Sequence, residues 1–367
     1  MCHACAPSPV STDAFAEQIL DVLNHGSLGL MLSIGHRTGL FDAMGDGAWR
    51  TSDRLARETR LDERYVREWL GAMVCGDVVH QRTPDAPGAS ADAVDQPREF
   101  ALPAEHAAVL TRQNPTDNMA VFAQYLAVLG GVEDDVVECF RQGGGVPYER
   151  YPRFHAVMAE DSNQSAVAGL ETHVLPLVPE LAARLDEGID VLDLGCGRGR
   201  AINALARLYP RSRFVGLDLS EEAIATARHE ARGLANVSYI VQDATTFDAA
   251  QAYDHVFTFD AIHDQARPDV VLSAIRRALR PGGTYLMQDI QGAGDPAMDA
   301  AHPMSTFIYT ISCMHCMTVS LAQGGMGLGA AWGRPMAERM LADAGFESIE
   351  VKSLEHDVQN FYYVCRA

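Results

Sequence analysis

Three glycines placed at alternate positions carry the clearest chemical signal in this chain. Gly195, Gly197 and Gly199 follow directly after the apolar run that ends at Leu194. Glycine allows a tight backbone turn and lets a ligand approach the main chain closely. A strand, a glycine turn and the start of a helix form a common site for nucleoside cofactors. The segment therefore predicts a site of this kind.

The spacing of the glycines decides between cofactors. A dinucleotide fingerprint has glycine at its first, third and sixth positions. In this chain the third glycine stands at the fifth position, and Arg200 occupies the sixth. The arginine side chain would fill the space that a pyrophosphate and a close helix–strand contact need. The pattern therefore disfavours a dinucleotide.

Acidic residues follow the expected strands in order. Asp193 lies in the glycine segment, Asp218 ends the second expected strand, and Asp243 follows the third. A carboxylate after the second strand can accept hydrogen bonds from both hydroxyls of a ribose. Asp260 ends the fourth strand. The sequence thus predicts a parallel α/β sheet whose carboxyl edge binds a nucleoside.

From about Ile189 to Ala367, these motifs resemble the class I S-adenosylmethionine (SAM) methyltransferases. The resemblance implies a seven-stranded Rossmann-like sheet that ends in a hairpin, with SAM as cofactor. The whole chain looks like a group of actinobacterial-type winged-helix methyltransferases that act on small molecules. The implied cofactor contacts are Asp193, Gly195, Cys196, Gly197, Gly199, Asp218, Leu219, Gln242, Asp243, Ala244, Phe259 and Asp260.

The same resemblance gives some of these residues a role. It implies that Asp193 anchors the amino group of the cofactor and that Asp218 binds the ribose. It also implies that Asp243 accepts from the adenine amine, while backbone groups at Phe259 and Asp260 meet the methionine end.

His263 is the candidate general base. It follows the fourth expected strand, as a histidine does in the O-methyltransferases that this segment resembles, and its ordinary pKa suits proton transfer near neutrality. A packing or cofactor-contacting role for His263 is the alternative. Asp264 is expected either to orient the imidazole or to cap the next helix.

An insertion between the fifth strand and the hairpin, residues 291–333, is the best candidate for a lid over the acceptor. Its apolar helix with flanking glycines predicts substrate contacts at Tyr309, Met314, Met317 and Trp332. A second candidate wall is the stretch Gln124–Glu149. Motifs of adenine-N6 and cytosine-C5 methyltransferases are missing, so a small-molecule acceptor is expected.

Charge and hydropathy exclude several classes of partner. The formal net charge is −20, and Lys352 is the only lysine, so a phosphate-binding surface and nucleic acid are disfavoured. No apolar run is long enough to span a membrane. The first residues lack a signal-type apolar segment, which predicts a cytoplasmic protein.

The N-terminal region predicts a winged helix. Helical periodicity in Asp62–Val74 and short strands near Val78–His80 and Phe100–Leu102 give this pattern. The pattern fits DNA binding or a dimerisation scaffold, and the mixed charges of the second helix favour a homodimer. The expected domains are residues 1–150, a helical linker at 151–187, and the SAM-binding domain at 188–367.

Two Cys-x-x-Cys pairs leave an alternative open. Cys2 and Cys5, and Cys313 and Cys316, have a spacing that soft ligands or zinc can use, although small thiols are also common in cores. We predict no metal. The sequence therefore predicts O- or N-methylation of a small, partly aromatic or apolar acceptor. The alternatives are a thiol- or metalloid-directed methyltransferase and a SAM-sensing regulator.

Overall fold

The computed structural model describes residues 11–83, 98–114, 116 and 118–367. The chain divides into two compact units, residues 1–127 and 128–367. The second unit begins before the predicted boundary near residue 150, because residues that precede the sheet pack onto it. The N–H of Val146, for example, donates to Thr318 Oγ1 at 2.8 Å.

The N-terminal unit begins with one long helix, α1 (Thr12–Thr38). Ser11 caps it, as its Oγ accepts from the N–H of Ala14, and Gly39 ends it with φ of 73°. The sequence predicts two apolar stretches here, and the structure joins them in a single helix. The left-handed backbone at Gly39 explains why the helix ends there.

The predicted winged-helix elements are present, with one additional strand. Their core packs around Trp69 and Phe41, whose rings meet edge to face with centroids 5.2 Å apart. The additional strand is β1, which was too short to predict, and the strand order is β1-β3-β2. The elements are α2 (Leu40–Met44), β1 (Arg50–Thr51), α3 (Ser52–Thr59), α4 (Glu63–Cys75), β2 (His80–Arg82), β3 (Glu99–Ala101) and α5 (Ala104–Leu110).

Arginines on α4 form ion pairs within their own helix. Arg64 pairs with Glu68, and Arg67 pairs with Glu63 at 3.1 Å, both one helical turn apart. A phosphate backbone needs clustered cations that are not already neutralised. The helix that would enter a DNA groove therefore presents balanced charge.

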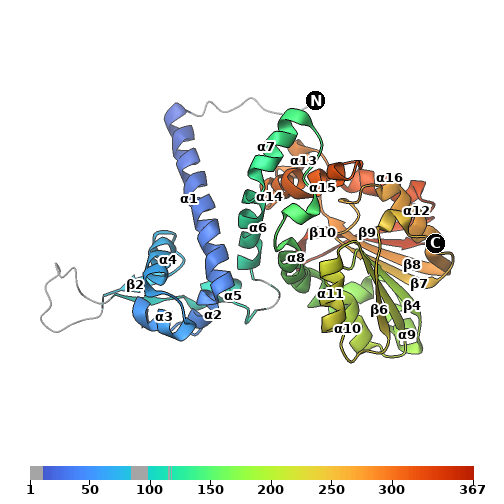
Figure 1. The fold of residues 1–367 in the computed structure, drawn as a ribbon, viewed down its shortest axis with the longest axis horizontal. Coiled ribbons are helices and arrows are strands. Elements are labelled where there is room, and N and C mark those ends of the chain that lie inside the picture. The colour runs from blue at the N-terminus through green and yellow to red at the C-terminus, as the bar shows by residue number, and fades with distance from the viewer. Residues whose placement is uncertain (1–10, 84–97, 115, 117) are drawn as a thin grey trace, which may run out of the picture. The chain divides into compact units, whose positions relative to one another are not determined.

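The second unit is built on the expected seven-stranded sheet, in the order β6-β5-β4-β7-β8-β10-β9 (Figure 1). Strands β6, β5, β4, β7 and β8 run parallel, while β10 is antiparallel to both β8 and β9. Every predicted strand is confirmed to within a few residues. The strands are β4 (Asp190–Leu194), β5 (Arg213–Asp218), β6 (Val237–Val241), β7 (Tyr253–Phe259), β8 (Leu279–Ile290), β9 (Ser348–Leu354) and β10 (Asp357–Arg366).

The glycine turn expected before the fifth strand lies inside β8. The pairing of β7 with β8 shifts between Tyr253↔Leu279 and His255↔Thr284, so the intervening residues form a bulge. Gly282, with φ of 77°, supplies the backbone conformation that the bulge needs. The turn is thus present, but it does not interrupt the strand.

Side chains alternate between two cores, one on each face of the sheet. Leu192 of β4 packs in the core that contains α12 and α16, while Val191 packs in the core that contains α10 and α11. Both positions are fully buried. Because the parallel strands end at one edge, the residues after β4, β5, β6, β7 and β8 come together there.

The remaining helices precede the seven-stranded sheet, connect its strands or lie in the predicted lid. Helices with π-type geometry lie at Asn163–Val167, Leu170–Val174 and Ser312–Cys316. None of the described helices is both long and apolar enough to cross a membrane. The α-helices are α6 (Ala120–Gly130), α7 (Glu133–Gln142), α8 (Phe154–Ser162), α9 (Leu181–Glu187), α10 (Arg200–Leu208), α11 (Glu221–Glu230), α12 (Pro268–Ala278), α13 (Pro296–Asp299), α14 (Ser305–Ile311), α15 (Met317–Ala322) and α16 (Arg334–Asp343).

Candidate active site

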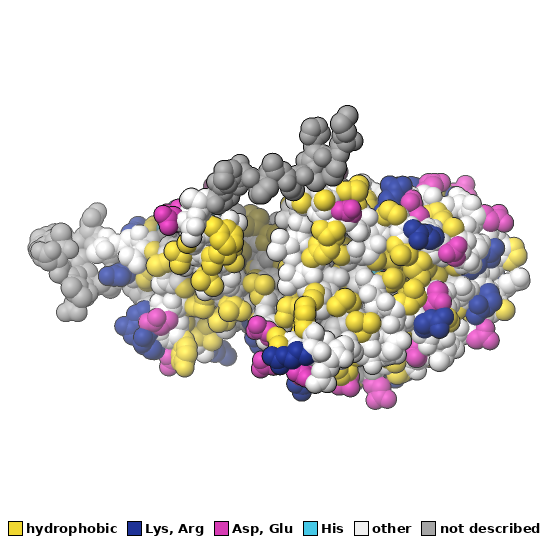
Figure 2. Space-filling view, turned by 90° about the horizontal axis from the view of Figure 1, so that it is seen from above, with side chains coloured by type: hydrophobic (Ala, Val, Ile, Leu, Met, Phe, Trp, Pro, Cys, Tyr) yellow, Lys and Arg dark blue, Asp and Glu magenta, His cyan; other side chains and the backbone are white. Residues whose placement is uncertain are grey.

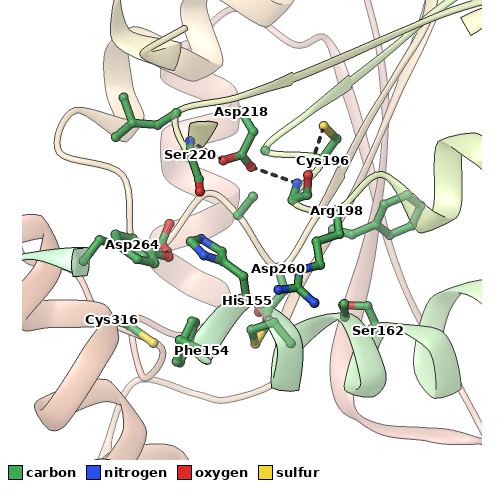
Figure 3. A pocket seen from close by; sticks show the side chains of 18 of the residues that line it. Phe154, His155, Ser162, Cys196, Arg198, Asp218, Ser220, Asp260, Asp264 and Cys316 are labelled. Carbon is green, nitrogen blue, oxygen red and sulfur yellow. Dashed lines mark hydrogen bonds between the residues drawn. The ribbon is translucent and has the colours of Figure 1, made fainter. Parts of the chain in front are cut away.

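A cavity of about 720 Å³ lies at the carboxyl edge of the parallel strands, within the second unit. Figure 3 shows Asp218 and Ser220 at one end of the view and Phe154 and Cys316 at the other. We call these the cofactor end, formed by the loops after β4, β5 and β6, and the acceptor end, formed by residues 148–159, 263–265 and 311–330. Phe259, Asp260 and Ala261, at the end of β7, line the same cavity.

The glycine loop is held against β5 by main-chain hydrogen bonds. The N–H groups of Gly195 and Cys196 both donate to the carbonyl of Leu217, at 2.8 and 3.1 Å. A Cβ on Gly195 would lie 2.5 Å from Ala261, and its φ is 77°, so a side chain is disfavoured twice there. Gly199 does not line the cavity. It packs α10 against Tyr239 instead, whose hydroxyl a Cβ would meet at 2.6 Å.

Asp218 is fixed by the loops on either side of it. One carboxylate oxygen, Oδ2, accepts from the N–H of Gly197, and Oδ1 accepts from the N–H of Ser220, both at 2.8 Å. Each carboxylate oxygen can accept more than one hydrogen bond. The side chain is therefore oriented by backbone donors and keeps acceptor capacity toward the cavity that it lines.

Asp193 is buried without a full set of partners. Its side chain is 2% exposed, and Oδ1 has no hydrogen-bond partner among the described residues. Burial, together with the nearby Asp218 carboxylate, raises the pKa of Asp193 to about 8. Such a group favours a cationic ligand that would pair with its charged form.

The other predicted cofactor residues also reach the cavity. Asp243 is oriented by Thr245, because its Oδ1 accepts from both the N–H and the hydroxyl of Thr245 at 2.8 Å. The structure thus brings all of the predicted cofactor residues except Gly199 to one cavity. Besides the glycine loop, Asp193, Asp218 and Asp243, the lining includes Leu219, Gln242, Ala244, Phe259 and Asp260.

His263 lines the cavity and is joined to Asp289, a residue that the sequence reasoning missed. The Nδ1 of His263 lies 2.8 Å from Asp289 Oδ1, and the two side chains are 3% and 0% exposed. The same oxygen accepts from the indole N–H of Trp332 at 3.1 Å and from the N–H of Ile290 at 2.8 Å. Asp289 could have been found as a polar residue near the carboxyl end of a buried strand.

The protonation of His263 depends on its charged neighbours. Burial lowers the pKa of His263, but the Asp289 carboxylate and the nearby Cys316 outweigh it. The pKa of His263 therefore lies well above its usual range. When neutral, such an imidazole is a stronger base than an ordinary histidine.

Asp260 stands beside this pair in a strained conformation. Its φ is 53°, and its Oδ1, which has no hydrogen-bond partner among the described residues, lies 3.7 Å from His263 Nδ1. Burial raises the pKa of Asp260 to about 7. Among the described residues, the possible ligand atoms of Asp260, His263 and Asp289 lie close enough together to hold a metal ion.

Asp264 does not orient His263 in the way that the sequence suggested. Its Oδ2 accepts from the hydroxyl of Tyr148 at 2.7 Å, while Asp289 takes the position beside the imidazole. Burial raises the pKa of Asp264, and His263 and the Tyr148 hydroxyl act in the opposite direction. Asp264 therefore links the cavity to the segment before α8.

An aromatic wall that the sequence reasoning did not single out closes the acceptor end. It consists of Tyr148, Tyr151, Phe154, His155 and His315, all of which line the cavity. Tyr148 stacks on His155 at 5.4 Å, and Phe154 stacks on His315 at 3.5 Å between centroids. The sequence predicted a second wall up to Glu149, which includes the first of these residues.

The predicted lid supplies different residues from those expected. The described lining of the cavity does not include any of the four predicted substrate contacts, Tyr309, Met314, Met317 and Trp332. Tyr309 donates to Asp299, and the carbonyl of Met314 accepts from Tyr151, while Trp332 acts through Asp289. The prediction rested on the apolar and aromatic composition of the insertion, which does not say which side chains face the cavity, and the helix has π geometry at Ser312–Cys316.

The two cysteines of the lid do not act as a pair at the cavity. Cys316 lines it and is buried, whereas Cys313 is not among the described residues of the lining. Cys2 and Cys5 lie outside the described residues. The four-thiol arrangement that the sequence left open is therefore not assembled by the described part of the chain.

Comparisons with known proteins agree with this geometry. Residues 185–339 match a methyltransferase domain family, and residues 26–112 match the Rv2258c-like winged HTH domain family. A fatty-acid O-methyltransferase of Mycolicibacterium smegmatis is 34% identical over 160 residues, which cover 43% of this chain and 54% of the relative. A trans-aconitate 2-methyltransferase of an Azoarcus species is 33% identical over 122 residues, 32% of this chain and 46% of the relative. The chain thus aligns with about half the length of each.

Solved structures match over nearly the whole chain. A putative O-methyltransferase of Nostoc punctiforme has a TM-score of 0.69 at 20% identity, with 99% of this chain and 100% of that one covered. Human N-acetylserotonin methyltransferase, solved in complex with SAM, has a TM-score of 0.67 at 17% identity, with 98% and 99% covered. These likenesses establish the fold. The two family matches show that the chain carries a methyltransferase domain preceded by a winged HTH domain.

Proposed function

We propose that this protein transfers the methyl group of SAM to an oxygen or nitrogen of a small, partly apolar or aromatic acceptor. The observation that carries the proposal is the buried His263–Asp289 pair, which lies in the same cavity as the glycine loop and Asp218. A base near a nucleoside site is what transfer to a protonated nucleophile requires.

The cofactor end fits SAM in its charge and shape. The unpartnered Oδ1 of buried Asp193 suits the cofactor's ammonium group, and Asp218 has acceptor capacity for the ribose hydroxyls. Asp243, which Thr245 orients, is the acceptor that we assign to the adenine amine. The absence of a side chain at Gly195 keeps the loop close to Ala261, so that backbone can border the methionine end.

When bound, SAM supplies an electrophilic methyl group on a sulfonium. The chain's own residues orient the acceptor, exclude water and receive its proton. Nδ1 of His263 faces Asp289, so Nε2 is the atom left to take the proton. The Asp289 carboxylate then stabilises the imidazolium, and the Trp332 and Ile290 donors hold that carboxylate in place.

The protonation state of His263 must change during the cycle. Its raised pKa keeps the imidazole protonated in the protein alone. A sulfonium in the same cavity would lower that pKa through like-charge repulsion, and so favour the neutral base. Cofactor binding would thereby prepare the site for the acceptor.

The direct test is a product screen with SAM that carries a ¹³C-methyl group. Phenols, amines, thiols, carboxylic acids and arsenite are offered separately, and labelled products are detected by mass spectrometry. We expect labelled methyl ethers or methylamines from aromatic acceptors, and labelling slower by about a hundredfold or more with the variant His263→Ala. Cofactor binding is measured in parallel by calorimetry.

Other outcomes of this screen would identify the alternatives. Labelled thioethers or methylarsenic species would favour a soft acceptor, which Cys316 beside His263 could assist. Binding of SAM without transfer to any acceptor, together with SAM-dependent binding of DNA, would favour a regulator. The ion pairs within α4 argue against that regulator.

We also infer that the protein forms a homodimer through α1. Large apolar side chains recur on this helix at the spacing of one face, and they are exposed in the single chain. Figure 2 shows hydrophobic side chains gathered on the N-terminal unit. A second copy is the occupant with a matching apolar face. The exposed residues are Phe15, Ile19, Leu20, Val22, Leu23, Leu30 and Ile34.

Sedimentation equilibrium tests the dimer. We expect a dimer for the wild-type protein and a monomer for the double variant Ile19→Glu, Leu23→Glu, because two buried charges would oppose association. The matched variant Glu17→Gln, Asp21→Asn changes neighbouring positions without removing the apolar face. A monomeric wild-type protein would contradict the inference.

A further inference from the structure

His315 is a buried imidazole whose two nitrogens have no hydrogen-bond partner among the described residues. The residue is 1% exposed and lines the cavity, and neither Nδ1 nor Nε2 forms a hydrogen bond within the described part of the chain. Buried polar groups are nearly always hydrogen-bonded, because an unpaired group loses its contact with water without compensation. An imidazole left in this state on a cavity wall is suited to bind a ligand.

The aromatic wall holds this ring in place without satisfying it. Phe154 stacks on the His315 ring, with 10° between their planes, and Tyr151 and Tyr148 meet it edge on at 4.7 and 5.0 Å. Both tyrosine hydroxyls donate elsewhere, to the carbonyl of Met314 and to Asp264. The rings therefore fix the orientation of the imidazole, while its nitrogens stay available.

His315 is neutral in this setting. Burial lowers its pKa well below the usual range, and the nearby His263 and His155 lower it further. A neutral imidazole offers one N–H donor and one nitrogen acceptor. It can therefore hydrogen-bond a hydroxyl in either direction or accept from an N–H, without attracting an anion.

His315 and the candidate base serve the same end of the cavity. Cys316, the next residue of the π-type turn, interacts electrostatically with His263, and the charge of His263 acts on His315. An acceptor whose reacting oxygen meets His263 would thus present another part of itself to His315. Acidic side chains gather at this end, at Asp260, Asp264 and Asp289, and any of them that is ionised opposes a negatively charged acceptor.

We propose that His315 recognises a second polar group on the acceptor, next to the oxygen that receives the methyl group. This inference rests on the proposed function and narrows its substrate class to flat, uncharged phenols with a neighbouring hydroxyl or carbonyl. The ring of such an acceptor matches the aromatic wall. Its second polar group pairs with the imidazole, so analogues without that group leave His315 unpaired and are rejected.

The test compares two probes that differ in a single hydroxyl, 4-methylcatechol and 4-methylphenol. For each, kcat/KM for methyl transfer is measured, as is equilibrium binding to the protein loaded with S-adenosylhomocysteine. We expect the wild-type protein to prefer the catechol at least tenfold in both measurements. His315→Leu removes both nitrogens and should bring the preference close to one, while His315→Asn should restore part of it because an amide also donates and accepts.

Controls separate recognition from structural damage. His173→Leu replaces an exposed imidazole outside the cavity lining and should keep the wild-type preference. Affinity for SAM should be unchanged in every variant. If His315→Leu does not fold, as judged by circular dichroism, the catechol preference is compared in His315→Asn and His315→Gln instead.

The outcomes distinguish this inference from the proposed function. Methylation of phenols with the same catechol preference in wild-type and His315→Leu proteins would overturn the role of His315 and leave the proposed function intact. Catechol binding that depends on His315, without methyl transfer, would support recognition and overturn O-methylation of phenols. Absence of both binding and transfer for the two probes would overturn the substrate class proposed here.

Discussion

The two ends of the cavity are built in different ways. At the cofactor end, polar side chains are fixed by main-chain N–H groups, as those of Ser220 and Gly197 fix Asp218. At the acceptor end, side chains from separate segments fix one another. His263 meets Asp289, Asp289 meets Trp332, and Tyr148 meets Asp264.

This difference separates binding of the cofactor, which stays the same for every acceptor, from recognition of the acceptor, which varies. The cofactor end can be formed by short motifs that keep their geometry whatever acceptor is used. The acceptor end depends on the packing of several elements, so its shape can change without disturbing the loops that bind SAM. We expect substitutions at the two ends to give different kinetic signatures, loss of SAM affinity at one and loss of kcat at the other.

The largest effect is expected from His263→Ala. If His263 is the general base, kcat should fall by about a hundredfold or more, while SAM affinity changes little. Stopped-time assays with labelled SAM measure the rate, and calorimetry measures the affinity. His302→Ala, at a histidine outside the cavity lining whose ring bonds the carbonyl of Val358 and the N–H of Met304, serves as control. A variant that keeps nearly full kcat would make His263 a packing residue.

Asp218→Ala tests the cofactor end and should produce the opposite signature. Removing the ribose acceptor should weaken SAM binding by roughly ten- to a hundredfold, because unpaired hydroxyls cost about 1–3 kcal/mol. The rate at saturating SAM should be much less affected. Asp269→Ala removes a carboxylate that pairs with Arg267 away from the cavity, and controls for net charge. Unchanged affinity would remove Asp218 from the cofactor site.

Asp289→Asn tests the contact between elements at the acceptor end. The donors from Trp332 and Ile290 should keep the amide oxygen at the Oδ1 position, so His263 keeps its tautomer. We expect kcat to fall by about tenfold, since the imidazolium loses a charged partner.

The pH profile of this variant gives the sharper readout. A base works when deprotonated, and the pKa of His263 is raised, so wild-type kcat/KM should rise with pH through a value above the usual histidine range. In Asp289→Asn that limb should move to lower pH. Trp332→Phe, which removes a neutral donor to the same oxygen, should move it less. Coincident profiles for the wild-type protein and Asp289→Asn would contradict the pairing.

The smallest effect concerns stability. The pKa of Asp193 is about 8 in the folded protein, far above that of an exposed aspartate, so the folded state favours the protonated carboxyl. Stability from this group is full at acid pH and is lost as pH rises toward 8. Asp193→Asn should therefore raise the Tm of the cofactor-free protein at pH 8 by a few degrees, with less effect at pH 5.

The same substitution should weaken SAM binding, because the cofactor's ammonium loses its charged partner. Calorimetry and thermal melts at both pH values measure the two effects together. Asp269→Asn is the matched control for the loss of one carboxylate. Equal melting changes at pH 5 and pH 8 would show that Asp193 is not held protonated.

Local signals made the sheet and the cofactor end predictable. Strand patterns, the three glycines and the acids after successive strands all operate within a few residues, and the structure brings the predicted cofactor residues together, with Gly199 alone set back from the cavity. Asp289 could have been found from its place in a strand. Its pairing with His263 could not, because it depends on the register of β7 and β8.

The acceptor end escaped prediction for a different reason. Met314 and Met317 were chosen as large apolar side chains of the insertion, whereas His315 and Cys316, in the π-type turn at Ser312–Cys316, line the cavity. The other members of the aromatic wall, residues 148–155, lie about 160 residues from His315 in sequence, and the hydrogen bond from Tyr151 to Met314 joins the two segments. No periodicity in either segment reveals that the two meet.

The π-type turn at Ser312–Cys316 also bears on how such an enzyme acquires new acceptors. A π turn holds one residue more than an α turn, so deleting a single residue there would return the helix to regular geometry. That change would rotate His315 and Cys316 relative to α14 and replace them with neighbours of other chemistry. One codon lost or gained in this helix could therefore redirect substrate choice in evolution while the SAM half is inherited unchanged.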